Sequence, residues 1–206
     1  MFLGFCAVLV MLAAVCAGGD LRRLATLQFR FGWLIFVCLV VQVLIISVLP
    51  DGHTAMAGIA HVLTYVGALL VVWFNRSMFG LPVLGLGAFC NGLAIAVNGG
   101  TLPATRSASA AAHVKVDRSG LVNAAPLAHP HLIWLGDIMA SPSWLPLRNT
   151  VSIGDLLILL GAALLVWKTS GARPFRASDP GDPEPAAADA PEPDMTEPDM
   201  TEPATA

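Results

Sequence analysis

The chain has 206 residues, of which 56% are hydrophobic and only 12% are charged, about half the charged share of an average soluble domain. The apolar residues stand in unbroken runs without the periodicity of amphipathic helices or strands, which argues against an ordinary soluble core. The net charge of −3 averages a basic body and an acidic end, because residues 178–206 carry nine of the fourteen acids and no base. No basic stripe with interleaved aromatic residues is present, so nothing in the sequence supports nucleic-acid binding.

Five apolar runs predict an all-α fold, a polytopic membrane helical bundle with about five transmembrane helices that bury their perimeter in the lipid bilayer. No basic segment precedes the first run, and Arg22 and Arg23 follow it, so we interpret it as an uncleaved helix rather than a signal peptide. The transmembrane domain should cover residues 1–170, with helices over residues 2–17, 31–49, 54–74, 81–98 and 152–168.

A loop over residues 99–150 separates the fourth predicted helix from the fifth. Within it, residues 131–146 contain short apolar stretches around Trp134 and Trp144 that are too short to cross a bilayer. Indole rings favour the headgroup region of a membrane. We therefore expect an interfacial or re-entrant segment here, and the sequence leaves open which of the two it is.

The basic residues are divided unevenly between the two sides that five helices would create. The long loop holds only four of them, whereas the opposite side holds seven. By the positive-inside rule the richer side is cytoplasmic, which predicts a multi-pass protein with its N-terminus outside and its C-terminus in the cytoplasm. The seven basic residues of that side are Arg22, Arg23, Arg30, Arg76, Lys168, Arg173 and Arg176.

Residues 177–206 form an acidic, proline-rich tail that ends in two copies of Glu-Pro-Asp-Met-Thr, at 192–196 and 197–201. A segment with so little to bury cannot offset the entropy of ordering, so we predict a disordered cytoplasmic tail. Recruitment of a basic partner is the alternative use of its charge.

Two carboxylates stand after glycines at the edges of apolar stretches, Asp137 and Asp155. Acids near membrane depth are costly, which makes both candidates for a functional site. For Asp155 the spacing Ser152-x-x-Asp155 is also typical of a capping box, in which the hydroxyl and the carboxylate satisfy free N–H groups at a helix start. For Asp137 the alternative to a functional role is an interfacial acid that simply reaches water.

Asn91 and Asn98 are seven residues apart, on one face of the fourth predicted helix. An interhelical hydrogen bond is the structural alternative to a functional role for Asn91, and a left-handed helix stop at Asn98-Gly99-Gly100 is the alternative for Asn98. A ladder of small residues on a neighbouring face would let another helix, of this chain or of a membrane partner, approach closely. The ladder consists of Ala88, Gly92 and Ala96.

Histidines offer only weak candidates for chemistry. His129 and His131, with His113 upstream, form a loose H-x-H group, whereas zinc sites usually show tighter pairings. His61 lies four residues before Tyr65 within the third helix, where a hydrogen bond to a neighbouring helix competes with a proton-relay role. No nucleophile elbow or phosphate-binding glycine loop is present, and no cofactor is predicted.

Four short motifs occur in order along the chain: Gly18-Gly19-x-Leu21-x-Arg23-Leu24, Asn98-Gly99-Gly100-x-x-Pro103, Leu135-Gly136-Asp137-Ile138 and Ser152-x-Gly154-Asp155. Together they resemble an uncharacterised family of bacterial integral membrane proteins, domain of unknown function 5317. The resemblance covers roughly residues 1–170 and departs at Leu102, where methionine is usual before the proline. It implies several helices in a bacterial inner (plasma) membrane and carries no activity.

Three classes of function are compatible with these features. A non-catalytic membrane subunit or scaffold is favoured, because catalytic motifs are lacking. A membrane enzyme would use an outer-face site around Asp137 and Asp155. A small-solute transporter or channel would need a shared polar pathway, for which Gln42, His61 and Asn91 are sparse material. Topology predicts that Asn98, Asp137 and Asp155 gather near the outer face.

Overall fold

The computed structural model describes residues 2–48, 55–113, 124–142 and 148–173 of the chain. All of these belong to one structural unit, Met1–Pro174. Trp144 and the acidic tail over residues 177–206 lie outside the described residues. The predictions made for them therefore remain predictions.

The described chain is mostly helical, and five apolar helices begin and end within two residues of the expected bounds. Two of them, α3 and α6, are long and apolar enough to cross a membrane, whereas the apolar parts of the other three are shorter, at 14 to 17 residues. The five helices are α1 (Phe2–Cys16), α2 (Gly32–Val48), α3 (Ala55–Phe74), α4 (Leu81–Val97) and α6 (Ile153–Ser170).

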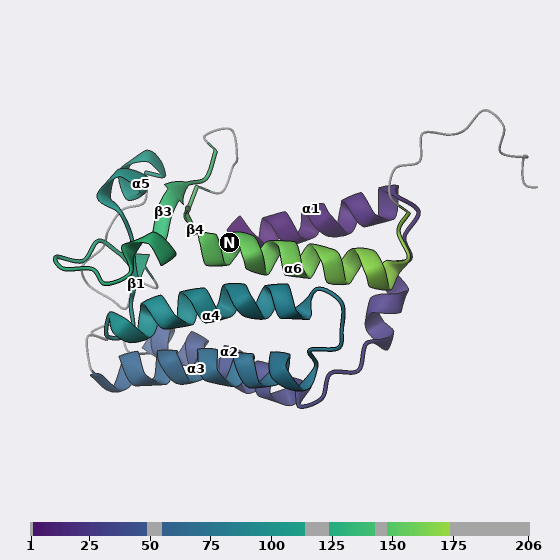
Figure 1. The fold of residues 1–206 in the computed structure, drawn as a ribbon, viewed down its shortest axis with the longest axis horizontal. Helices are drawn as coiled ribbons and strands as arrows, with labels where there is room; N and C mark the ends of the chain where they lie inside the picture. The colour runs from purple at the N-terminus through teal and green to yellow at the C-terminus, as the bar shows by residue number, and fades with distance from the viewer. Residues whose placement is uncertain (1, 49–54, 114–123, 143–147, 174–206) are drawn as a thin grey trace, which may run out of the picture. The chain divides into compact units, whose positions relative to one another are not determined.

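In space the helices follow a different order from the sequence. α6 lies between α1 and α4, α4 packs on α3, and α3 packs on α2 (Figure 1). The last helix thus inserts beside the first, and backbone hydrogen bonds tie their ends together: Asp20 N donates to Ser170 O over 2.9 Å, and Arg173 N donates to Ala17 O over 3.1 Å.

The contact between α4 and α6 depends on glycines. A Cβ on Gly87 would collide with the carbonyl oxygen of Gly154, and a Cβ on Gly161 would collide with the backbone nitrogen of Leu84. One turn further on, Gly80 lies against the carbonyl oxygen of Gly161 with φ +91°, a conformation that favours glycine. Both helices therefore carry glycines seven residues apart on the facing sides, and their backbones approach closely.

The predicted small-residue ladder is mostly covered within the chain itself. Ala88 is 6% exposed, and a Cβ on Gly92 would meet the Cβ of Tyr65 in α3 at 3.1 Å. Only Ala96 is exposed. α3 thus already occupies part of the face that was expected to admit a membrane partner.

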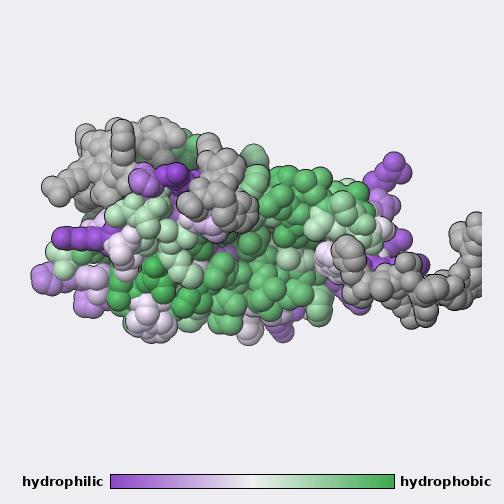
Figure 2. Space-filling model, turned by 90° about the horizontal axis from the view of Figure 1, so that it is seen from above, coloured by the Kyte–Doolittle hydropathy of each residue, from purple (hydrophilic) through white to green (hydrophobic). Residues whose placement is uncertain are grey.

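Large apolar side chains face outward from every one of the five helices. Figure 2 shows the result on one face, a hydrophobic band with polar residues at both of its ends. Examples, one from each helix in chain order, are Leu12, Phe36, Ile59, Phe89 and Leu160. Side chains of this kind exposed in such numbers mark a surface that is normally covered.

The segment over residues 99–150 is more structured than the sequence predicted. Its described residues form a short α-helix, the 3₁₀ helix η2 (Ile133–Leu135) and two small sheets, which an all-α fold would lack. These elements gather at one end of the helices (Figure 1). The strands are too short for an alternating pattern to show in the sequence. The helix is α5 (Arg106–Ala111), the parallel pair is β1 (Leu102–Pro103) with β2 (Ala124–Ala125), and the antiparallel pair is β3 (Asp137–Ala140) with β4 (Thr150–Ser152).

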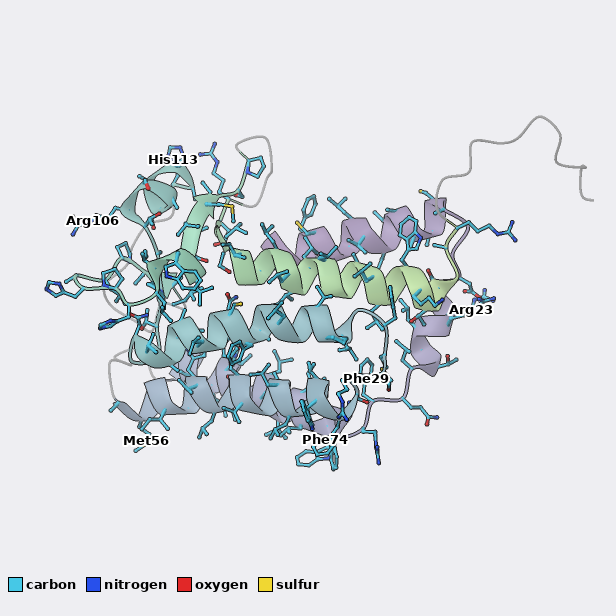
Figure 3. All side chains as sticks on the ribbon, in the orientation of Figure 1. Arg23, Phe29, Met56, Phe74, Arg106 and His113 are labelled. Atoms are coloured by element: carbon cyan, nitrogen blue, oxygen red, sulfur yellow. The ribbon has the colours of Figure 1, made fainter. Side chains whose placement is uncertain are left out.

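The opposite end carries the 3₁₀ helix η1 (Leu21–Thr26), which Asp20 caps by accepting from Arg22 N over 2.9 Å. Figure 3 places Arg23 and Phe74 at this end and Arg106 and His113 at the other. The segment around Trp134, predicted to be interfacial or re-entrant, contains a 3₁₀ turn followed by a strand, and Trp134 is 58% exposed.

We predict that Gly154→Ala lowers the melting midpoint of the protein purified in detergent. The added methyl group would overlap Asn91 Oδ1 and the Gly87 carbonyl oxygen, and overpacking of this kind costs about 1–3 kcal/mol. Gly4→Ala in α1 is the matched control, because its Cβ would meet nothing within 4 Å. Equal melting of the two variants would contradict the glycine contact.

Candidate functional site at the junction of α4 and α6

Three polar side chains form a closed hydrogen-bonded group where α4 meets the start of α6. Asn91 Nδ2 donates to Asp155 Oδ1 over 2.9 Å, and Ser152 Oγ donates to Asn91 Oδ1 over 2.9 Å. The interhelical hydrogen bond predicted for Asn91 is thereby confirmed. Asn91 is 2% exposed and Ser152 is fully buried, so this hydrogen-bonded group lies inside the contact between the two helices.

The capping box predicted at the start of α6 is also confirmed. Asp155 N donates to Ser152 Oγ over 2.9 Å, and Ser152 N donates to Asp155 Oδ2 over 3.0 Å. Both carboxylate oxygens of Asp155 are therefore engaged, one by the cap and one by Asn91. The acid also lies in the first turn of the helix, where negative charge is favoured. Its role in this arrangement is structural.

Asp137 lies next to this group because β3 pairs with β4, which places Asp137 opposite Ser152. Its carbonyl oxygen accepts from Thr105 N over 3.0 Å, and its Oδ2 accepts from Thr150 Oγ1 over 2.6 Å. The side chain is 4% exposed, and Oδ1 has no hydrogen-bond partner among the described residues. The alternative of an interfacial acid that reaches water is therefore wrong for this conformation.

Burial is the main reason that the pKa of Asp137 rises from 3.8 to about 6. The hydrogen bond from Thr150 opposes this rise, and the negative charge of Asp155 adds to it. Chemically, Oδ1 can hold a proton or accept from one donor. It is the single buried side-chain oxygen or nitrogen of the described residues that has no hydrogen-bond partner.

Asn98 does not join this network, although topology placed it nearby. Its Nδ2 donates to Ala94 O over 2.7 Å and to His131 O over 2.8 Å, and its Oδ1 accepts from His131 N over 2.8 Å. Asn98 thus clamps the backbone of the long segment onto the end of α4. The helix stop predicted here is confirmed, since Gly99 and Gly100 have φ of +70° and +97°.

Asn75, which sequence reasoning did not single out, repeats this arrangement at the other end. Its Nδ2 donates to Val71 O over 2.7 Å and to Arg30 O over 2.9 Å, and its Oδ1 accepts from Arg30 N over 2.8 Å. The available signal was a polar residue directly after an apolar run, the same signal that marked Asn98.

The polar groups within the helices also have internal partners. His61 Nδ1 lies 2.7 Å from Gly100 O, so the bonding predicted for His61 goes to the turn after α4. Gln42 Nε2 donates to Thr64 Oγ1 over 2.9 Å and thereby links α2 to α3. These contacts hold helices together.

His129 and His131, the weak candidates for metal binding, lie in different settings. His129 is exposed, and His131 contributes its backbone to the Asn98 clamp. Within the described parts of the chain, no three His, Cys, Asp or Glu residues lie together as a metal site would require.

The sequence profile of a family of unknown function, DUF5317, matches residues 26–167. This confirms the resemblance noted from the motifs. The matched range includes Asn91, Asn98, Asp137 and Asp155, and it leaves out the first helix with the Gly18-Gly19 motif. No curated protein and no solved structure matches the chain.

We predict opposite effects on stability for the two acids. Asp155→Asn should lower the melting midpoint, because the cap and the bond from Asn91 lose a charged acceptor at a cost of about 1–2 kcal/mol. Asp137→Asn should raise it at pH 8, because a buried charge with an unpartnered oxygen is removed.

The raised pKa of Asp137 predicts that the stability of the fold depends on pH. Because the pKa of Asp137 is higher in the folded chain, its contribution to stability is fully present below pH 3.8 and is lost as the pH rises through about 6. Melting midpoints of the wild type should therefore fall from pH 5 to pH 8 by more than those of Asp137→Asn. Parallel pH profiles for the two proteins would contradict the assignment.

We predict that Asn98→Ala releases the long segment without unfolding the helices. Limited proteolysis should cut within residues 99–150 faster than in the wild type, since the two bonds to the His131 backbone are lost. Asn75→Ala is the matched variant, because it removes the same set of bonds at the other end and should leave cleavage of this segment unchanged. Equal cleavage of both variants would contradict a local clamp.

Proposed function

The chain belongs to the family of unknown function DUF5317, and from its structure we propose that it is a membrane protein with five transmembrane helices that acts as a non-catalytic subunit or scaffold. The observation that carries this proposal is the apolar perimeter, with large exposed side chains on all five helices between two polar ends (Figure 2). Apolar surface of this extent is unfavourable in water at about 25 cal/mol per Å². A bilayer removes that cost.

The helix lengths suit a bilayer with modest adjustment. α3 has 20 residues, which corresponds to about 30 Å, whereas α1 has 15 residues, or about 22 Å. A shorter span is accommodated by local thinning of the bilayer at a small cost per ångström. α1 also lies directly against α6, so the pair enters the membrane together.

The charge distribution supports one orientation. Arg22, Arg23, Arg30 and Arg76 lie in the connections at the end of the helices that carries η1, and Arg106 lies at the other end (Figure 3). With the basic end in the cytoplasm, the N-terminus is outside and the C-terminus inside, in a bacterial plasma membrane. The acidic tail then enters the cytoplasm, where its charge suits a basic partner.

The way in which the polar side chains are used supports a non-catalytic role. Asn91 bonds from α4 to Asp155 on α6, and Asp155 also caps the start of α6. Asn98 bonds to the backbone of the outer segment. Residues engaged in this way position a structured segment on a helical base. That is the task of a scaffold or subunit.

A second candidate, an outer-face enzyme site, is favoured only by Asp137. Its Oδ1 is the one buried side-chain oxygen or nitrogen among the described residues that has no hydrogen-bond partner. If Asp137→Asn abolished a cellular phenotype while the amount of protein and its melting midpoint were maintained, the enzyme would replace the scaffold as the proposal.

We predict that single cysteines, introduced into a cysteine-free variant expressed in spheroplasts, are labelled from opposite sides of the membrane. Ser107→Cys, exposed in α5, should react with a membrane-impermeant maleimide in intact spheroplasts. Ser77→Cys, exposed in the turn after α3, should react only after lysis. Labelling of both from outside would contradict the five-span arrangement, as would recovery of the full chain in the soluble fraction without detergent.

A further inference from the structure

The clamp made by Asn75 brings together two arginines that are distant in sequence. Asn75 is 3% exposed and binds both the N–H and the carbonyl of Arg30. Arg76 is its direct neighbour in the chain. The clamp thus fixes the backbones of Arg30 and Arg76 beside each other where α2 begins and α3 ends, while both side chains are exposed.

Neither arginine has an acidic partner among the described residues. The acids there are Asp20, Asp137 and Asp155, and the last two belong to the opposite end of the helices. Asp20 Oδ1 accepts from the backbone of Arg22 at the start of η1. Two exposed arginines therefore extend from neighbouring backbone positions with no counter-ion in the described part of the chain, an arrangement that favours binding of an anion.

Aromatic rings surround the two arginines on the same end of α2 and α3. The guanidinium of Arg76 lies over the Trp73 ring, 4.6 Å from its centroid, and donates to Trp73 O over 2.9 Å. The Phe31 and Phe74 rings contact each other with centroids 4.9 Å apart. Trp33 and Trp73 remain 66% and 62% exposed. Exposed indoles beside exposed arginines suit the headgroup layer, where both kinds of group are favoured.

We infer that this end of α2 and α3 binds the phosphodiester headgroup of an anionic glycerophospholipid. The inference rests on the proposed membrane location. Guanidinium groups match phosphate oxygens with paired N–H donors. The acyl chains would lie along the outward apolar side chains that continue from this end, including Phe36 on α2 and Leu70 on α3. A free phosphate would share the arginines but gain nothing from that apolar surface.

The test compares lipid binding by full-length variants in detergent, read by native mass spectrometry during titration with dimyristoyl phosphatidylglycerol or phosphatidylcholine. Arg30→Gln with Arg76→Gln should weaken phosphatidylglycerol binding about twenty-five-fold, at about fivefold for each arginine. Phosphatidylcholine binding should stay unchanged. The clamp uses only the backbone of Arg30, so the double variant keeps it. The variant loses only the exposed contacts of Arg76 with Trp73, and its melting midpoint should stay close to that of the wild type.

Two controls carry the same change in charge. Arg22→Gln with Arg23→Gln lies at the same end on η1, and Arg106→Gln with Arg148→Gln lies in the long segment. Both should lose clearly less phosphatidylglycerol binding than the Arg30 and Arg76 variant, because neither pair belongs to the proposed headgroup site. An equal loss in the η1 variant would show diffuse attraction and overturn the site, and so would competition by millimolar inorganic phosphate.

The outcomes separate this inference from the proposed function. If the wild type requires detergent, shows the predicted labelling, and yet binds both lipids equally, the headgroup site is refuted and the membrane role stands. If the chain is soluble without detergent, the proposed function fails first.

Discussion

The close backbone contact between α4 and α6 is the constraint on which the rest of the structure depends. Gly87 against Gly154 and Gly161 against Leu84 leave no room for a Cβ on the facing sides. In lipid the hydrophobic effect does not drive helices together. Helix contacts of this kind then depend on close packing and on the hydrogen bonds that close approach permits. The hydrogen bonds from Asn91 to Asp155 and from Ser152 to Asn91 can form because the close approach of the two backbones brings these side chains within reach of each other.

This contact also determines where the outer segment can fold. Ser152 belongs to β4, to the cap of α6 and to the bond with Asn91, so one residue joins the small sheet to the helix pair. β3 pairs with β4, and this pairing buries Asp137 next to the cap of Asp155. The carboxylate with one unpartnered oxygen is thus a consequence of local packing. Its raised pKa follows from the same burial.

The sequence predicted the apolar helices well, because uninterrupted runs bounded by glycine, proline or asparagine need no partner to be recognised. The capping box at Ser152 and Asp155 was equally visible, since its two residues are three apart. The strand pair of β3 with β4 was not visible, because its strands are short and their register is set by tertiary contacts. The same limit explains Asn98: spacing placed it near Asp155, whereas its bonds go to His131, 33 residues along the chain. The expected cluster therefore formed around Asn91 and without Asn98.

Asn75 and Asn98 perform the same task at the two ends of the helices and leave opposite chemistry behind. Each follows an apolar helix, returns one bond to the carbonyl four residues earlier and binds both backbone groups of one distant residue. At the Asn98 end the connected segment is long and has its own strands, and the described chain carries Asp137 and Asp155 there. At the Asn75 end the connections are short, so Arg30, Arg76 and aromatic rings remain at the surface without an acidic partner among the described residues. The same asparagine clamp thus gives the helices one end whose polar groups mostly bond to one another and another end whose arginines stay exposed.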